Sequence, residues 1–330
     1  MIMDDYLLTY TGSLLLDGRY IVSPYGVSKE SPCGDLSPLN NPTIFNNSIN
    51  EVSVDYSKVK SLTVINGLGV TLGDSVVGIS ALHAIKKINP RIAIRVIRPE
   101  NCPDYVNEIY TLAKHIIDDI SYMPFDITSF SGADLVIDIG NQLYWKGFDT
   151  LEMHDFFLRN LGVEHSQVST SLKSNAWLRY SPIEDLNLGE YVLFCPYAST
   201  KIRSIPTRYH RNIISYLSGR FRVKVLGFSE ISHENYTNIT GLSKNTVSFA
   251  SIIKNAKHLY TCDSAALHIG AGFNTPTTCI FTTVKPELRS LYYKNCKSIY
   301  IGNNETEGVH NSENVRLLDL INKEFEVYYA

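Results

Sequence analysis

The sequence has few of the features that mark secreted, membrane or metal-scaffold proteins. Its 330 residues include six cysteines, which are widely scattered and form no C-x-x-C pair. This spacing argues against a disulfide framework or a zinc scaffold and is typical of buried thiols in a reducing compartment. The first residues, Met1 to Asp5, lack the basic region and apolar core of a signal peptide. No apolar run is long enough to cross a bilayer, so we predict a cytoplasmic protein without a membrane span.

The chain also lacks an excess of charge and the usual nucleotide motifs. Charged residues make up only 19% of the sequence and the formal net charge is -3, so nucleic acid is not favoured as a partner. Gly67-Leu68-Gly69 has no correctly spaced third glycine, and the lysine of a P-loop is absent. What the chain does have is length and 44% hydrophobic residues, which predict two α/β domains with two cores.

The N-terminal part differs from the rest of the chain. β-type residues broken at Thr11-Gly12 and at Asp17-Gly18 predict short strands joined by hairpin turns. The stretch 28–50 is rich in Ser, Pro and Asn and predicts an irregular surface loop. We therefore expect residues 1–58 to form an N-terminal extension of short strands and irregular loop.

From residue 60 onward, strand-like and helix-like segments alternate in two series. This alternation predicts an α/β protein with two doubly wound Rossmann-like domains that face a central cleft. We place them at 59–185 and 186–330, with the linker at 180–189. An alternative is that the terminal helix packs back on the first domain. The expected strands are 62–65, 92–97, 134–138, 191–195, 223–226, 259–262, 277–281 and 298–301.

The segment 259–281 predicts a strand, a polar turn, a small-residue helix, a tight turn and a second strand. Its polar turn follows the carboxyl end of a parallel strand, where open α/β sheets bind ligands. Backbone N–H groups from Ser264 onward point out of a helix N-terminus, and such an end binds phosphate well. An equally open alternative is that Asp263 or Ser264 only caps the helix. His268, one turn into this helix, either binds ligand or only packs there.

A basic loop follows the predicted strand that ends at Cys195. Two cations and two hydroxyl side chains crowd this loop, which suits a diphosphate because Arg and Lys neutralise charge on a leaving phosphate. The alternative is an ordinary solvated loop. Glu230 follows the next strand, where an acidic side chain can accept hydrogen bonds from ribose hydroxyls or can simply be exposed. The residues of the basic loop are Ser199, Thr200, Lys201 and Arg203.

The first domain offers a carboxylate in the corresponding place. Gly73-Asp74 opens a predicted helix, and a negative charge there repels a diphosphate but suits proton transfer from an acceptor. Asp74 as a mere helix cap is the commoner case for a lone Asp. In that case Asp138, at the end of a neighbouring strand, is the next candidate base. Gly73, Ser75 and Asp138 are the acceptor-side candidates.

Four segments in order resemble glycosyltransferase family 9, the heptosyltransferase-like enzymes of the GT-B fold. The resemblance covers roughly residues 60–325. The matching residues are Leu72 to Val77 with Ala81-Leu82 and Pro90, then Asp134 to Asp138, then Lys201 to Pro206, and Asp263-Ser264 with His268, Thr275-Pro276 and Phe281.

The resemblance implies inverting transfer from a nucleotide-diphospho-sugar, usually ADP-heptose, without a metal or other cofactor. By motif position, Asp74 resembles the family's catalytic base, and Arg203 falls where the family has a phosphate-binding lysine. Glu230 resembles the ribose ligand, and Ser264 to Leu267 resemble the diphosphate-binding turn. The full set of nucleotide-sugar candidates is Ser199, Thr200, Lys201, Arg203, Glu230, Asp263, Ser264, Ala265, Ala266 and His268.

The chain departs from the family pattern in the donor region. Ala265 replaces a glycine, Ile205 replaces a tryptophan, and Thr282-Thr283 replace Gly-Pro, which leaves the sugar open. The acceptor is also open among a glycan, a protein hydroxyl and a modified nucleobase. A nucleotide-sugar epimerase of the same fold and a non-catalytic nucleotide-sugar-binding protein remain as alternatives.

Overall fold

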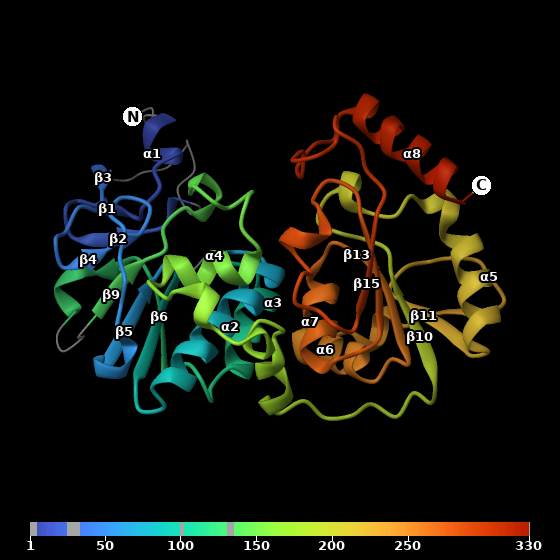
Figure 1. Cartoon of the computed structure of the whole chain (residues 1–330), viewed down its shortest axis with the longest axis horizontal. Helices are drawn as coiled ribbons and strands as arrows, with labels where there is room; N and C mark the ends of the chain where they lie inside the picture. Colours follow the sequence, from blue (N-terminus) through green and yellow to red (C-terminus); the bar gives the residue numbers. More distant parts are fainter. Residues whose placement is uncertain (1–4, 25–33, 100–101, 131–134, 330) are drawn as a thin grey trace. The chain divides into compact units, whose positions relative to one another are not determined.

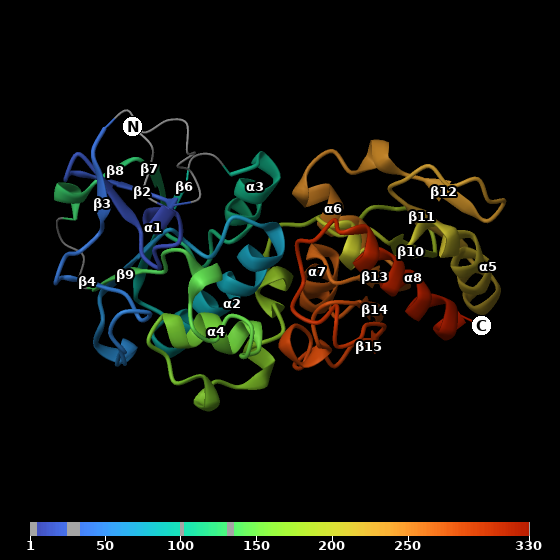
Figure 2. The same cartoon turned by 90° about the horizontal axis from the view of Figure 1, so that it is seen from above.

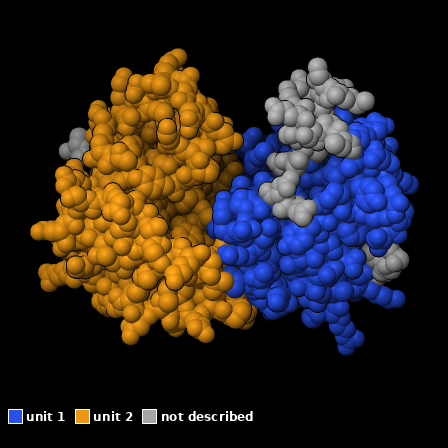
Figure 3. Space-filling view, turned by 180° about the vertical axis from the view of Figure 1, so that it is seen from behind, with its two compact units in different colours: residues 1–173 blue, residues 174–330 orange. Residues whose placement is uncertain are grey.

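The chain forms two compact units in the computed structural model, which describes residues 5–24, 34–99, 102–130 and 135–329. Figure 3 colours the units, residues 1–173 and 174–330. The predicted boundary between 185 and 186 is therefore wrong. The reason is that the 3-10 helix η7 (Ala176–Tyr180) packs on α7 (Ala265–Phe273) and buries Trp177 completely, so these residues belong to the second unit.

The first unit contains a five-stranded parallel sheet in the order β4-β9-β5-β6-β7 (Figure 1). Strands β5, β6 and β7 follow one another in one direction, whereas β9 returns to the other side of β5. The order therefore reverses between β5 and β9, which is where sheets of this kind bind ligands. The elements are β4 (Ile44–Phe45), β5 (Ser61–Ile65), β6 (Ala93–Pro99), β7 (Asp119–Met123), β9 (Leu135–Asp138), α2 (Leu72–Ile88), α3 (Asp104–Leu112) and α4 (Met153–Asn160).

The N-terminal residues form a second, antiparallel sheet within the same unit, in the order β3-β1-β2-β8. The predicted hairpin at Asp17-Gly18 is confirmed: it joins β1 to β2, and both residues have positive φ, as a type I′ turn requires. The predicted turn at Thr11-Gly12 joins no hairpin and follows the short helix α1 instead. These elements are α1 (Asp5–Leu8), β1 (Leu14–Leu16), β2 (Tyr20–Val22), β3 (Leu36–Pro38) and β8 (Phe125–Asp126).

The N-terminal segment is not a separate extension. Ile21 and Leu39 pack in one cluster with Ile65 and Ile97 of the parallel sheet, so the two sheets share a core. The stretch 28–50 was expected to be irregular, but it contributes β3 to one sheet and β4 to the other. Residues 28–33 of that stretch lie outside the described residues. The local sequence predicted the hairpin between β1 and β2. It did not predict the pairing of β2 with β8 or of β4 with β9, because these strands lie far apart in the chain.

The second unit contains a six-stranded parallel sheet in the order β12-β11-β10-β13-β14-β15 (Figures 1 and 2). Counted along the chain, this is the order 3-2-1-4-5-6 of dinucleotide-binding domains, and it reverses between β10 and β13. The elements are β10 (Tyr191–Cys195), β11 (Lys224–Gly227), β12 (Tyr236–Asn238), β13 (His258–Cys262), β14 (Thr277–Phe281), β15 (Cys296–Tyr300), α5 (His210–Phe221), α6 (Thr246–Lys254) and α8 (Val315–Tyr329).

The terminal helix α8 packs on the second unit, although the prediction allowed it to pack on the first. Phe325 is completely buried and its ring stacks on Tyr209 with centroids 5.5 Å apart. Arg208 Nη2 donates a 2.7 Å hydrogen bond to the carbonyl oxygen of Asn322. Ile321 and Phe325 thereby extend the core that β10 and α5 begin.

Two expectations from composition agree with the structure. Cys102, Cys195, Cys262 and Cys279 are buried free thiols and Cys296 is half-buried, whereas Cys33 lies outside the described residues. Among the described residues, no helix combines the length and apolarity that a membrane span needs.

Candidate functional site

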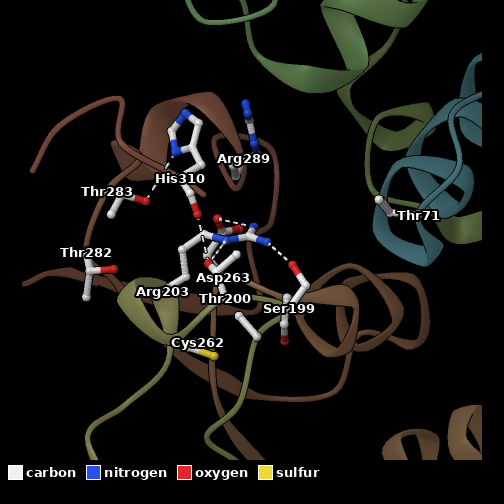
Figure 4. Close-up of polar contacts among 12 residues, drawn as sticks. Thr71, Ser199, Thr200, Arg203, Cys262, Asp263, Thr282, Thr283, Arg289 and His310 are labelled. Carbon is white, nitrogen blue, oxygen red and sulfur yellow. Dashed lines mark hydrogen bonds and ion pairs between the residues drawn. The ribbon is translucent and has the colours of Figure 1, made fainter. Parts of the chain in front are cut away.

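The basic loop of the second unit lies at the point where its strand order reverses. Cys195 ends β10 and pairs with Thr261 of β13, so the residues that follow both strands emerge side by side. The loop contains the 3-10 helix η8 (Lys201–Arg203). Figure 4 shows the Arg203 guanidinium among Ser199, Thr200 and Asp263. The prediction that the loop after β10 and the turn after β13 lie side by side is therefore confirmed.

Three side chains fix the Arg203 guanidinium in this loop. Its Nη2 donates to Ser199 Oγ, and its Nε donates to Thr200 Oγ1 at 3.2 Å. Its Nη1 lies 3.4 Å from Asp263 Oδ2. Asp263 is 4% exposed, so its carboxylate orients Arg203 and is not open to solvent. Lys201, by contrast, is exposed, and no ion pair joins it to another described residue.

Helix α7 begins beside Arg203 with an N-terminus that no side chain caps. Ser264 occupies the N-cap position with extended backbone angles, but its side chain makes no capping hydrogen bond. The Ser264 hydroxyl instead lies 3.3 Å from Thr261 Oγ1. The alternative that Ser264 only caps the helix is therefore wrong. The N–H groups of Ala265 and Ala266 lie in the first turn, where the helix dipole favours an anion.

Two loops that sequence reasoning did not select support the basic loop. Thr282 Oγ1 donates a 2.7 Å hydrogen bond to the carbonyl oxygen of Ile202, inside η8. Thr200 Oγ1 donates to the carbonyl oxygen of His310, whose ring Nδ1 lies 3.2 Å from Thr283 Oγ1. The sequence did hold a signal for these loops, namely Thr282-Thr283 in place of the family's Gly-Pro. Threonine has a side-chain hydroxyl that can form these hydrogen bonds, whereas glycine and proline have none.

The acidic candidate Glu230 lies on an exposed loop after β11. Its Oε1 accepts a hydrogen bond from Nδ2 of Asn238, the last residue of the neighbouring strand β12. Glu230 is exposed, as the alternative predicted, but its carboxylate is held by this partner, and ribose binding stays a prediction.

His268 lies in the interior of the second unit and not at its edge. The residue is 4% exposed, and its Nδ1 lies 2.7 Å from the hydroxyl of Tyr293. Asn175 Nδ2 donates to the same hydroxyl and to the carbonyl oxygen of His268. We therefore correct the prediction that His268 binds the nucleotide-sugar: it joins α7 to the segments around it.

In the first unit, Asp74 stands in the first turn of α2 but does not cap the helix. Thr71 is the N-cap, and its Oγ1 accepts a 3.3 Å hydrogen bond from the Asp74 N–H. The alternative that Asp74 is the N-cap is therefore wrong, and its half-buried side chain does not accept that capping bond. A carboxylate in the first turn is also favoured by the helix dipole.

Gly69 lies close to the Asp74 carboxylate and leaves open space beside it. Its φ of +85° is a left-handed conformation that glycine adopts without strain. A Cβ at Gly69 would lie 3.2 Å from Asp74 Oδ2 and 2.6 Å from Nε2 of Gln142. The side chains of Asp74 and Gln142 therefore converge on the space that this glycine leaves open. Gln142 begins the 3-10 helix η4 (Gln142–Tyr144), which follows β9. Sequence reasoning missed Gln142 because it lies far along the chain from Asp74 and α2.

Two of the acceptor-side candidates have structural partners instead. Ser75 is completely buried, and its Oγ donates to the Thr71 carbonyl oxygen at 2.8 Å. The Tyr110 hydroxyl lies 3.1 Å from the same Oγ and donates to the carbonyl oxygen of Gly67. Ser75 therefore joins α2 to Tyr110 of α3, which in turn bonds the loop after β5, and it is not open to an acceptor, which corrects that prediction. Gly73, in the first turn of α2, is half-buried.

Asp138 is the other corrected candidate. Its carboxylate accepts hydrogen bonds from the Ser13 N–H and Ser13 Oγ at 2.7 Å each, and from the Gly140 N–H at 2.8 Å. Asn46 Nδ2 adds a fourth at 3.3 Å. Burial raises the pKa of Asp138, while these donors oppose that rise. The carboxylate thus anchors the N-terminal segment to the end of β9, so Asp138 is no longer the second candidate base.

Comparison with solved structures identifies the fold. Heptosyltransferase II of Escherichia coli, which acts with ADP-heptose by its description, superposes with a TM-score of 0.52 and 14% identity over 82% of this chain and 100% of its own. A glycosyl transferase family 9 protein from Veillonella parvula gives 0.53 and 12% identity over 84% and 97%. The fold is that of the heptosyltransferase-like GT-B glycosyltransferases.

A third structure of this fold widens the comparison. TibC of enterotoxigenic Escherichia coli, described as an iron-containing dodecameric glycosyltransferase, gives a TM-score of 0.52 and 9% identity over 84% of this chain and 77% of its own. No protein-family model matches the sequence, and no curated protein matches it. Identities this low show the fold, which alone does not determine function.

Proposed function

We propose that this protein is a glycosyltransferase that moves a sugar from a nucleotide-diphospho-sugar to an acceptor hydroxyl. One observation carries the proposal: Arg203 is held by three side chains beside the uncapped N-terminus of α7, where the strand order of the second unit reverses. A fixed guanidinium and a helix N-terminus together form a diphosphate site.

The donor diphosphate lies on the second unit in this proposal. Arg203 and the N–H groups of Ala265 and Ala266 bind its oxygens, and exposed Lys201 adds charge. As the bond from the sugar's anomeric carbon to the phosphate oxygen breaks, both electrons pass to the diphosphate, and these groups stabilise the negative charge that develops. Because protein cations and a helix end do this, we propose a reaction without metal. The adenine base and a heptose sugar follow only from the family resemblance.

Asp74 is the proposed general base on the first unit. The acceptor oxygen forms a bond to the anomeric carbon on the face opposite the leaving diphosphate, which inverts the configuration. The acceptor hydroxyl then carries a proton that it must lose, and the Asp74 carboxylate takes it. Thr71 accepts the capping bond at α2, so Asp74 is not the N-cap of this helix.

The decisive experiment incubates the protein with a panel of nucleotide-diphospho-sugars and candidate acceptors. We expect one donor to release its nucleoside diphosphate and the acceptor to gain the mass of the sugar. Conversion of the donor to an isomer without acceptor would show an epimerase instead. Tight binding of a donor without turnover under any acceptor would show a binding protein. We keep a cytoplasmic location as part of the proposal, because the described cysteines are free thiols.

A further inference from the structure

The loop that carries Glu230 is held from one side by the neighbouring strand. Tyr236 and Asn238 are two residues apart in β12, so their side chains project from the same face of the strand. The Tyr236 hydroxyl donates a 2.9 Å hydrogen bond to the carbonyl oxygen of Ser229, and Asn238 Nδ2 donates to Glu230 Oε1. In Figure 2, β12 lies directly beside β11, from which this loop departs. Strand β12 thus fixes both the backbone and the carboxylate of the loop.

The amide of Asn238 is itself oriented by the turn that follows. Its Oδ1 accepts hydrogen bonds from the Thr240 N–H at 2.9 Å and from Thr240 Oγ1 at 2.6 Å. The N–H group of Thr240 can only donate, so the oxygen of the amide must face Thr240 and the nitrogen must face Glu230. The direction of the bond to Glu230 is therefore set by the backbone.

We propose that Asn238 is a positioning residue that holds Glu230 in place for a ribose hydroxyl and so sets the preference for ribonucleotide donors. The inference rests on the proposed function, which places the nucleotide on the second unit. Glu230 is exposed, and a free glutamate side chain loses rotamer freedom when it binds a ligand. The hydrogen bond from Asn238 to Oε1 restricts the Glu230 side chain before the ligand binds, so less rotamer freedom is lost on binding. Oε2 then accepts a hydrogen bond from the ribose.

The two roles of Asn238 can be separated by substitution. Asn238→Asp keeps an oxygen for Thr240 but loses the N–H donor and repels Glu230. Asn238→Ala loses both roles. Asn235→Asp, just before the same strand, adds the same charge without touching Glu230 and serves as the matched control. Glu230→Gln, alone and combined with Asn238→Asp, shows whether the effect passes through Glu230.

The measurement is the affinity, by calorimetry, of the tightest-binding nucleoside diphosphate among ADP, GDP, UDP and CDP, and of its 2′-deoxy and 3′-deoxy analogues. We expect the native protein to prefer the ribonucleotide by about tenfold over at least one analogue. Asn238→Asp and Glu230→Gln should each reduce that preference to about twofold or less, and the double variant should go no further. Asn235→Asp should retain the preference.

Other outcomes separate the inference from the proposed function. If Asn238→Asp keeps the native preference while Glu230→Gln loses it, Glu230 binds ribose without help and the inference fails. If Asn238→Ala weakens the ribonucleotide and both analogues equally and lowers the melting temperature, Asn238 only stabilises its turn, which also overturns the inference. If the native protein binds no nucleoside diphosphate, the proposed function itself fails.

Discussion

The helices α2 and α7 both start beside the point where a sheet reverses its strand order, but they treat their N-termini in opposite ways. Each follows the strand at which its sheet reverses order, β5 in the first unit and β13 in the second. At α2, Thr71 accepts the capping bond and Asp74 adds a negative charge to the first turn. At α7, Ser264 makes no capping bond, and Arg203 brings a positive charge.

Under the proposed function, this difference gives two similar folds different ligands. The α2 terminus is already complemented by the protein's own hydroxyl and carboxylate, so an external phosphate gains little there and meets repulsion. The α7 terminus retains its attraction for an anion. In the proposed function, each doubly wound sheet provides a ligand edge, and the first-turn residues decide whether that edge serves proton transfer or phosphate binding.

The largest expected effect tests the carboxylate side of this comparison. Asp74→Asn keeps the shape of the side chain but cannot take a proton, so turnover at saturating donor and acceptor should fall about a hundredfold or more. The free energy of unfolding should fall by no more than about 1 kcal/mol, from the lost charge at the helix terminus. If the variant keeps most of the native rate, Asp74 serves only the helix dipole and the base lies elsewhere.

Thr71→Ala is the matched variant for the structural role at the same helix. It removes the oxygen that accepts from the Asp74 N–H, so the free energy of unfolding should fall by about 1 kcal/mol. Thermal melting of the two variants then separates capping from proton transfer: a larger stability loss in Asp74→Asn than in Thr71→Ala would contradict the roles assigned to them.

The next effect tests the phosphate side. Arg203→Ala should weaken the binding of the free nucleoside diphosphate by about 1.5–3 kcal/mol, the cost of a lost hydrogen bond to a charged group. Lys201→Ala should cost less, because Lys201 is exposed and no ion pair joins it to another described residue. Arg208→Ala is the control, since Arg208 is an exposed arginine of the same unit that pairs with Glu326. Unchanged affinity in both Arg203→Ala and Lys201→Ala, measured by calorimetry, would move the diphosphate away from this loop.

Local patterns predicted the parts of this molecule that depend on nearby residues. The strands at 62–65, 191–195 and 277–281 were predicted because buried parallel strands are continuous apolar runs, and all three are present. The meeting of the loops after Cys195 and Cys262 followed from the rule that parallel strands end at one edge. The fold and the neighbourhood of Arg203 were therefore accessible from sequence.

Several failures depend on contacts between residues that lie apart in the chain. Asp138 was a candidate base because it ends a strand, but its carboxylate is hydrogen-bonded by Ser13, 125 residues away. His268 looked like a ligand, but Tyr293 and Asn175 enclose it. Asn238 gave no signal because its contact with Glu230, in the loop after the neighbouring strand β11, depends on the pairing of β11 with β12. No local periodicity encodes such pairs.

A smaller effect tests whether Asp138 is an anchor. Ser13→Ala removes one buried donor to its carboxylate, so the free energy of unfolding at neutral pH should fall by about 1–3 kcal/mol. The lost bond favours only the ionised form, so the variant raises the already raised pKa of Asp138 further. The destabilisation should thus be full above that pKa and shrink as the pH falls through it. Ser37→Ala, at an exposed serine of the same sheet, is the control. An equal loss at all pH values, in melting curves, would contradict the anchor.

The smallest expected effect is that of metal removal. It tests whether the protein's own charges beside the N-terminus of α7 are enough to stabilise the leaving diphosphate. The carboxylate nearest Arg203, Asp263, is buried and ion-paired, so a metal that bridged the diphosphate there would compete with the guanidinium for it. We therefore expect full turnover in excess chelator. Because a structure with this fold is described as iron-containing, the add-back series must include iron as well as magnesium and manganese. Turnover that falls in chelator and returns with one of these ions would mean that a metal neutralises the leaving diphosphate. In that case the contrast between α2 and α7 would not explain where the phosphate binds.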